Sequence, residues 1–248
     1  MTLSKRCLFL VLCCLPWAVS ANTTLYQHAQ AVGQTMSALY MQGLSEGNAK
    51  YERDLEFYKQ RAGETLAAFS KNNPDQGSEL SASWDDLKGK IKTTYSQEYG
   101  WDIDAAIRRD FRSYLSNIYQ LSLASATKAA SATEQYQFAL VQLESMIARF
   151  FDISSTYNGT VSLSSADLKA LDPAVISTEF KALLDSLAKV SAGSRTAKEL
   201  NSAKYKWEFI EDSVVNYTDQ SAYFLVYATK NKIKKVLSAG QVQLTGNN

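Results

Sequence analysis

KYKWEFIEDSVVNYT, residues 204–218, carries an apolar residue on each turn of a helix. From Trp207 to Val214 these residues recur at intervals of three and four, the spacing of one helix face. An earlier stretch, SWDDLKGKIKTTY, residues 83–95, repeats the pattern with Trp84 near its start. A tryptophan-led helical stripe that occurs twice predicts two similar helical modules in one chain.

The rest of the chain has the same periodicity. It is rich in Ala, Leu, Ser, Lys, Gln and Glu, and after residue 21 it holds only two prolines, which favours helix. No alternating apolar run with turn signals predicts a sheet. We therefore predict an all-α fold of antiparallel helical bundles. Apolar stripes predict helices over 25–39, 51–69, 80–95, 103–121, 136–150, 176–190, 200–217 and 226–236.

A module boundary is predicted at SLASATKAASA, residues 122–132, which has almost no large apolar side chain. This stretch is either a flexible joint or a continuous helix that bridges two bundles. The first module is then 22–127 and the second 128–248. Whether the two modules form one bundle or two stays open at this point.

Several helix ends carry capping signals. Asp102 or Asp104 is expected to cap the fourth helix, and Asp172 before a proline starts another. The polar stretch 154–165 is expected to be a loop. In the last helix, a run of lysines before Gly240 indicates a final turn followed by a stop.

Residues 1–21 have the layout of a secretory signal peptide. Lys5 and Arg6 precede an apolar run, 7–15, that is too short to span a bilayer, and small residues stand at the cleavage position before Asn22. A retained N-terminal anchor is the alternative. A lipoprotein signal is disfavoured because a leucine, not a small residue, precedes the candidate cysteine. We expect 1–21 to be removed on export.

The amino-acid composition indicates the cellular compartment and excludes some classes of partner. The three cysteines, Cys7, Cys13 and Cys14, all lie in the leader, so the mature chain would have no disulfide and no thiol ligand. An exported chain without disulfides favours a bacterial periplasm. The 26 basic and 25 acidic residues nearly cancel, so no nucleic-acid partner is expected. No second apolar stretch predicts a transmembrane segment after cleavage.

The sequence offers little catalytic chemistry. His28 is the single histidine, and without cysteine or a second histidine it lacks partners for a metal site. We expect it to be a polar surface or boundary residue. Paired carboxylates such as Asp85 and Asp86 are expected to be caps or solvated groups. We predict that the protein is not an enzyme and has no cofactor or metal.

Arginines and aromatics are the remaining candidates for a binding site. Arg108 and Arg112 lie on a helix with aromatic residues, which suits an anionic ligand. The alternative is a solvated face in which Arg108 pairs with Asp104 and Arg109 with the next residue. Likewise, a group of aromatics either lines a pocket or fills the core: Tyr95, Tyr99, Trp101 and Tyr119.

Both halves share one order of segments. A helix with a central methionine is followed by a second helix and then by a tryptophan-led helix. The segments are GQTMSALYM (33–41), YERDLEFYKQRAGETLAAF (51–69) and Trp84, then QLESMIARFF (142–151), FKALLDSLAKV (180–190) and KWEFIEDSVVNY (206–217). This order resembles two tandem copies of the PilJ-type domain, the periplasmic sensor module of type IV pili methyl-accepting chemotaxis transducers, which is related to nitrate-sensor bundles.

The resemblance implies a helical, periplasmic binding module. Such families often place an arginine before the methionine, where nitrate sensors meet the anion; Thr35 and Ser145 stand there in this chain. Without transmembrane helices or a signalling domain, it would be a free-standing relative that binds a small molecule, a membrane sensor or a pilus-associated protein. The alternative is a structural or chaperone-like helical protein without a specific small ligand. The predicted binding residues are Met36, Met146, Trp84, Trp207, Arg108 and Arg112.

Overall fold

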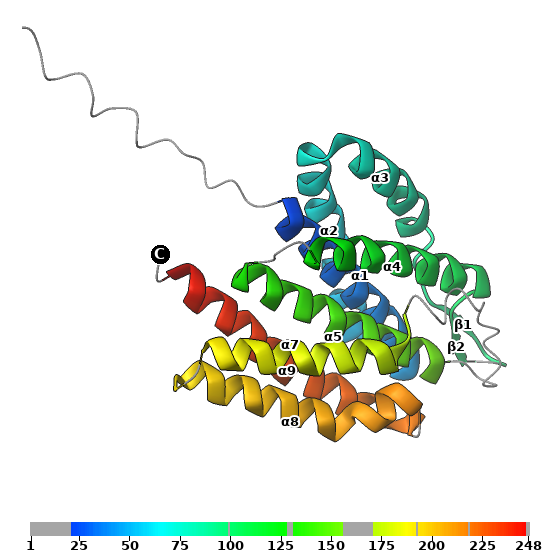
Figure 1. The fold of residues 1–248 in the computed structure, drawn as a ribbon. Helices are drawn as coiled ribbons and strands as arrows, with labels where there is room; N and C mark the ends of the chain where they lie inside the picture. Colours follow the sequence, from blue (N-terminus) through cyan, green and yellow to red (C-terminus); the bar gives the residue numbers. More distant parts are fainter. Residues whose placement is uncertain are drawn as a thin grey trace, which may run out of the picture.

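The computed structural model describes residues 21–98, 100–127, 131–155, 171–191, 193–217 and 219–246. They form an all-α helical bundle, as predicted (Figure 1). A two-stranded hairpin, β1 (Thr94–Ser96) and β2 (Gly100–Asp102), follows α3, and a short 3-10 turn, η1 (Gln220–Ala222), precedes α9. The helices are α1 (Ala21–Leu44), α2 (Ala49–Asn72), α3 (Pro74–Lys88), α4 (Ala105–Ala126), α5 (Ala132–Ser154), α7 (Pro173–Val190), α8 (Arg195–Asn216) and α9 (Tyr223–Gly246).

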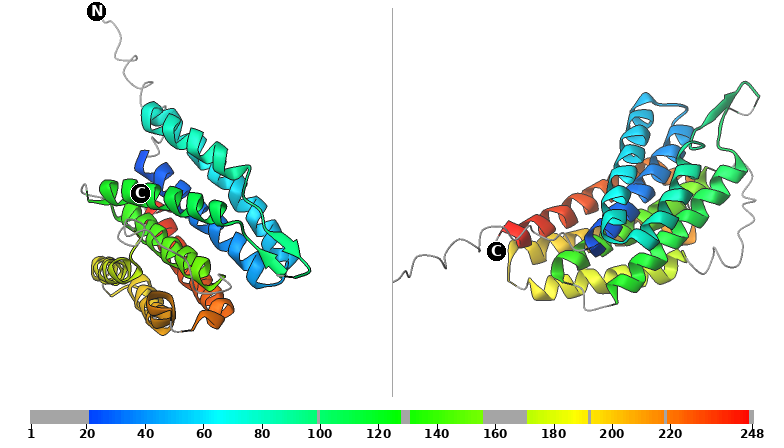
Figure 2. Two further views of the ribbon diagram at one scale, coloured as in Figure 1. Left: turned by 90° about the vertical axis from the view of Figure 1, so that its right-hand side faces the viewer. Right: turned by 90° about the horizontal axis from the view of Figure 1, so that it is seen from above.

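Helices α1 and α5 lie at the centre and pack on each other (Figure 2). Helix α2 covers α1 and is itself covered by α3, while α7, α8 and α9 cover α5, and α4 packs against both central helices. Residues 31–42 of α1 and 136–152 of α5 are buried without interruption. A helix enclosed on all sides has to be apolar around most of its circumference. The sequence FALVQLESMIARFF, 138–151, meets this requirement.

The buried apolar side chains of both halves belong to one continuous core. The sequence left open whether there were one or two bundles, and in the described residues the two halves share a single core. The division into modules 22–127 and 128–248 stays a prediction about how the chain is organised.

The starts of α4 and α7 follow the predicted capping signals, and α5 has a cap that was not predicted. Asp104 caps α4 by accepting hydrogen bonds from two backbone N–H groups, and Asp172 caps α7. Ser131 and Glu134 form a capping box at the start of α5. Because α4 ends at Ala126, the region 122–132 is not a continuous helix.

The β-hairpin was not predicted. Its strands are only three residues long and largely exposed, so they carry no alternating apolar pattern. Tyr95 pairs with Trp101 across the strands, with ring centroids 5.5 Å apart. The Trp101 ring packs on Gly47 in the connection between α1 and α2. Tyr99 and most of the predicted loop 154–165 lie outside the described residues.

The expected stop at Gly240 is wrong, because α9 continues to Gly246. A Cβ atom at Gly240 would lie 2.6 Å from a ring carbon of Tyr136 in α5. The glycine therefore allows α9 to approach α5 closely. As a result, Lys230 and Lys234 lie in the middle of a helix and not in its last turn.

Within the described part of the chain, no helix is both long and apolar enough to span a membrane.

Candidate functional site

The methionines and tryptophans predicted to form binding faces lie in the core. Met36 and Trp207 have no exposed area, and Met146 and Trp84 are each 1% exposed. In this structure a partner has no access to these four side chains. Their observed contribution is to core packing, and a binding role for them has no exposed surface to support it.

Trp84 packs in a cluster with His28 of α1 and Tyr114 of α4. Its ring is perpendicular to that of His28, at 5.9 Å, and tilted against Tyr114, at 5.5 Å. His28 is fully buried, so the expectation of a surface or boundary histidine is wrong. Its Nδ1 lies 2.9 Å from the carbonyl oxygen of Ala62, and its Nε2 lies 2.8 Å from the Tyr114 hydroxyl.

A carbonyl oxygen only accepts, so Nδ1 donates to Ala62. In a neutral ring Nε2 is then an acceptor for the Tyr114 hydroxyl, which also lies 3.3 Å from the carbonyl oxygen of Leu80. Burial lowers the pKa of His28 to about 4, against a smaller opposing effect of the Ala62 carbonyl. The side chain is therefore a neutral core group.

Trp207 occupies a related position in the second half. Like Trp84, it lies on a helix that packs against the preceding helix, here α7. Its ring meets Phe180 at 5.5 Å, and its Nε1 donates to Ser177 Oγ at 2.8 Å. The Trp84 indole nitrogen, by contrast, is buried without a hydrogen-bond partner among the described residues. The two indoles thus share a place in the helix order but not their neighbours.

Arg108 and Arg112 form a buried ion cluster and not a solvated face. They are 6% and 7% exposed, and both reach Asp152 near the end of α5. Arg149 also pairs with Asp152, at 3.0 Å. The predicted pairing of Arg109 with the adjacent aspartate is present on the surface, at 3.5 Å.

Arg108 also binds the end of the α5 backbone. Its guanidinium donates to the carbonyl oxygens of Asp152 and Ser155, at 3.2 and 3.1 Å, and to the Ser155 hydroxyl, at 2.8 Å. A cation at a helix C-terminus complements the helix dipole. The cluster thus fastens α4 to α5 and uses most of the hydrogen-bonding capacity of Arg108 for structure.

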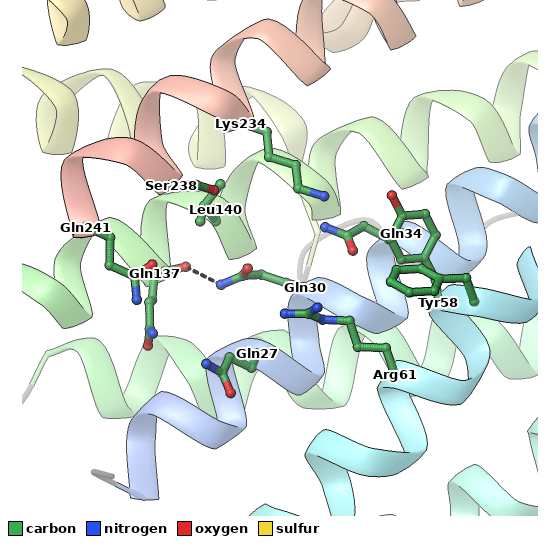
Figure 3. A pocket seen from close by; sticks show the side chains of 11 residues that line it. Gln27, Gln30, Gln34, Tyr58, Arg61, Gln137, Leu140, Lys234, Ser238 and Gln241 are labelled. Carbon is green, nitrogen blue, oxygen red and sulfur yellow. Dashed lines mark hydrogen bonds between the residues drawn. The ribbon is translucent and has the colours of Figure 1, made fainter. Parts of the chain in front are cut away.

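A polar pocket lies elsewhere, where α1, α2, α5 and α9 meet (Figure 3). We call it the glutamine pocket, and its volume is about 230 Å³. Each helix contributes side chains one turn apart, so that polar groups from four segments converge. The lining residues are Gln27, Gln30, Gln34, Phe57, Tyr58, Arg61, Gln137, Leu140, Lys234, Ser238 and Gln241.

Two cations reach this pocket from opposite walls. Figure 3 shows Arg61 extending from α2 and Lys234 from α9 towards the glutamines of α1 and α5. Behind Lys234 lies the fully buried Glu144, whose Oε1 is 4.0 Å from the lysine nitrogen. Glu144 also accepts from Gln34 at 3.0 Å and from Lys230 at 3.2 Å. One carboxylate is therefore shared by two lysines and an amide.

Some of the amide groups in the pocket already form hydrogen bonds within the protein. Gln30 donates to the main-chain oxygen of Gln137 at 3.1 Å, which joins α1 to α5 across the pocket. The side-chain oxygen Oε1 of Gln137 is buried and has no hydrogen-bond partner among the described residues. A buried acceptor without a donor is unfavourable. The oxygen has almost no accessible area, so a bound molecule with an N–H or O–H group would satisfy it only after the Gln137 side chain turns.

The two central helices approach each other closely next to Gln34, which lines the pocket. A Cβ atom at Gly33 would lie 3.0 Å from the Glu144 Cβ. The absence of a side chain at Gly33 lets α1 and α5 come together and brings Gln34 within reach of Glu144. The sequence analysis missed this site. The available signal was the spacing of Gln27, Gln30 and Gln34, which places three amides on one face of α1.

A second cavity, of about 340 Å³, lies between α4, α5 and α7. Leu123, Phe138 and Leu183 contribute to its lining, and it brings no pair of cations together. The described residues contain no group of three or more His, Cys, Asp or Glu side chains arranged to hold a metal ion. The glutamine pocket is therefore the strongest candidate for a binding site.

Comparison of the chain with known protein families, with curated proteins and with solved structures finds no match.

Proposed function

We propose that the protein is an exported, periplasmic, non-catalytic binding protein that holds a small polar solute in the glutamine pocket. The observation that carries the proposal is the convergence of amides and two cations from four helices around a cavity of about 230 Å³. Ligand sites commonly combine a concave shape with a few converging polar groups. Amide side chains donate and accept hydrogen bonds without exchanging protons, which suits recognition.

On the resemblance to PilJ-type modules, the bound protein would act as an accessory to a membrane sensor or a pilus-associated assembly. Helix α1 carries both the pocket glutamines and the segment GQTMSALYM that supports the resemblance. Co-purification of a single membrane receptor in the presence of the solute would support this role. Co-purification of a receptor that does not depend on the solute would contradict this accessory role.

A thermal-shift screen with amino acids, sugars, hydroxy acids and polyamines tests solute binding. A specific solute raises the melting temperature by mass action. The variant Ser238→Tyr fills the pocket and is expected to abolish the shift. Lys235→Tyr, on the exposed side of the same helix, is the control and should retain it. A flat response of the wild type across the panel would refute the solute binder.

The alternative, a chaperone-like protein, is favoured by exposed apolar side chains on the second half. Tyr205 and Phe209, one turn apart on α8, are 70% and 69% exposed. Exposed apolar groups can shield unfolded polypeptides. This function predicts that the chain suppresses the aggregation of several unrelated clients, and that Tyr205→Ser with Phe209→Ser removes the effect. A wild type that leaves client aggregation unchanged would exclude it.

A further inference from the structure

The charges around the glutamine pocket do not balance. Arg61 and Lys234 line it, and Lys230 lies behind it. None of the residues that line this pocket is acidic. The carboxylate of Glu144 lies 4.0 Å from Lys234 and already accepts from Lys230 and Gln34. The pocket therefore presents more positive than negative charge to anything that enters it.

Asp54 offsets only part of this excess. Its carboxylate lies 2.9 Å from the Lys50 nitrogen and 3.3 Å from the Tyr227 hydroxyl. It is thus engaged with a cation outside the pocket.

Lys234 shows the effect of the imbalance. Burial lowers its pKa; Glu144 and Asp54 oppose the change, while Lys230 and Arg61 reinforce it. Lys234 is partly buried and Arg61 is exposed. A partly buried cation close to other cations is stabilised by a further negative charge. An anion in the pocket would supply that charge.

The hydrogen-bonding groups define the rest of the ligand. Arg61 and Lys234 offer only donors, which match a carboxylate. Gln137 Oε1 is a buried acceptor, and it lacks a partner among the described residues. The volume of about 230 Å³ is below the range of about 300–1,000 Å³ that is usual for drug-sized ligands. The ligand is therefore small, with an anionic end and a donor group.

We propose that the glutamine pocket binds a small organic acid that also carries a hydroxyl or ammonium group. Its carboxylate lies on Arg61 and Lys234, and its donor binds Gln137 Oε1 once the Gln137 side chain turns towards the ligand. This inference rests on the proposed function, because it specifies the solute of the same pocket. It assigns the specificity for anions to two cations on α2 and α9, helices that are distant in the sequence.

Matched probes separate the two parts of the proposal. Short hydroxy acids such as lactate carry both groups, their amides such as lactamide lack the charge, and the deoxy acids such as propionate lack the donor. Calorimetry at constant ionic strength should show that at least one hydroxy or amino acid binds about tenfold or more tightly than its amide. It should also bind more tightly than its deoxy acid.

Charge variants test the two cations. Arg61→Gln and Lys234→Gln should each weaken binding of the acid about tenfold or more, and should leave binding of the amide nearly unchanged. Arg53→Gln on α2 and Lys232→Gln on α9 remove exposed cations that do not line the pocket, and should leave binding unchanged. Gln137→Leu removes the acceptor and should abolish the preference for lactate over propionate.

The outcomes distinguish this inference from the proposed function. If neutral solutes bind as tightly as acids, and Arg61→Gln and Lys234→Gln have no effect, the anion proposal is overturned while solute binding stands. If acids shift the wild type and the variants equally, binding is non-specific and the anion proposal is again overturned. If neither acids nor neutral solutes bind the wild type, the proposed function fails as well.

Discussion

Acidification from about pH 7.5 to about pH 5 is expected to destabilise the fold through His28. The pKa of His28 falls from 6.5 to about 4 on folding, since burial disfavours the charged ring. Between these two values the unfolded chain binds a proton that the native core does not accept. The stability due to neutral His28 is therefore complete above pH 6.5 and is lost as the pH falls towards 4.

The magnitude follows from the pKa difference. Lowering a pKa from 6.5 to about 4 corresponds to about 3 kcal/mol in total, of which about 2 kcal/mol is lost by pH 5. Solvent screening does not reduce this free energy, because the His28 ring has no exposed area. Above pH 7.5 this contribution does not change further.

Urea unfolding at several pH values and constant ionic strength measures the effect. The variant His28→Asn keeps a donor near the Ala62 carbonyl but does not titrate in this range, so it serves as the reference. It is expected to be less stable at neutral pH, because it leaves a small cavity, and to lose about 2 kcal/mol less than the wild type on acidification. Equal losses in the two proteins would refute the assignment of His28 as a neutral core group.

Three further predictions concern packing and buried charge. Asp152→Ala removes the carboxylate that three buried arginines share and should lower the free energy of unfolding by about 3–5 kcal/mol. Arg109→Ala, on the surface, should change it by less than about 0.5 kcal/mol. Equal effects of the two substitutions in urea unfolding would contradict the buried cluster. Gly240→Ala places a methyl group against the Tyr136 ring of α5 and should destabilise the fold by about 1–3 kcal/mol. Gly43→Ala, whose methyl group meets no atom within 4 Å, should stabilise the fold by up to about 1 kcal/mol. A gain in stability at both positions would exclude the close contact. Trp207→Ala should cost about 3–5 kcal/mol by thermal or urea unfolding, and a loss below about 1 kcal/mol would show that the indole does not anchor the core.

Apolar periodicity was sufficient to predict most of the helices. The predicted helix 80–95 is wrong beyond Lys88, because α3 ends there and Tyr95 lies in β1; the other predicted stripes lie within or largely within observed helices. Asp104 and Asp172 cap helices as expected. The reason is local: an apolar face and a capping group act within a few residues of the helix they define. The predicted helix end at Gly240 was wrong, because a sequence does not distinguish a glycine that ends a helix from one that permits close packing.

The candidate site could not be predicted in the same way. Arg112 looks solvated from its own helix, and its partner Asp152 lies 40 positions further along the chain. The glutamine pocket depends on four helices that meet only in the folded chain. A polar residue on a helix is solvated or buried depending on whether another helix covers that face. A single sequence does not show which helices pack together.

The arginine cluster at Asp152 also limits how the chain can be divided. Two of its cations belong to the first half, and the carboxylate belongs to the second. If the polypeptide were cut between α4 and α5, the first fragment would keep Arg108 and Arg112 without Asp152, and the second would keep Asp152 with Arg149 alone of its three arginines. Neither piece is then expected to fold alone, and the two expressed together should reassemble, with affinity that falls when Asp152 is replaced.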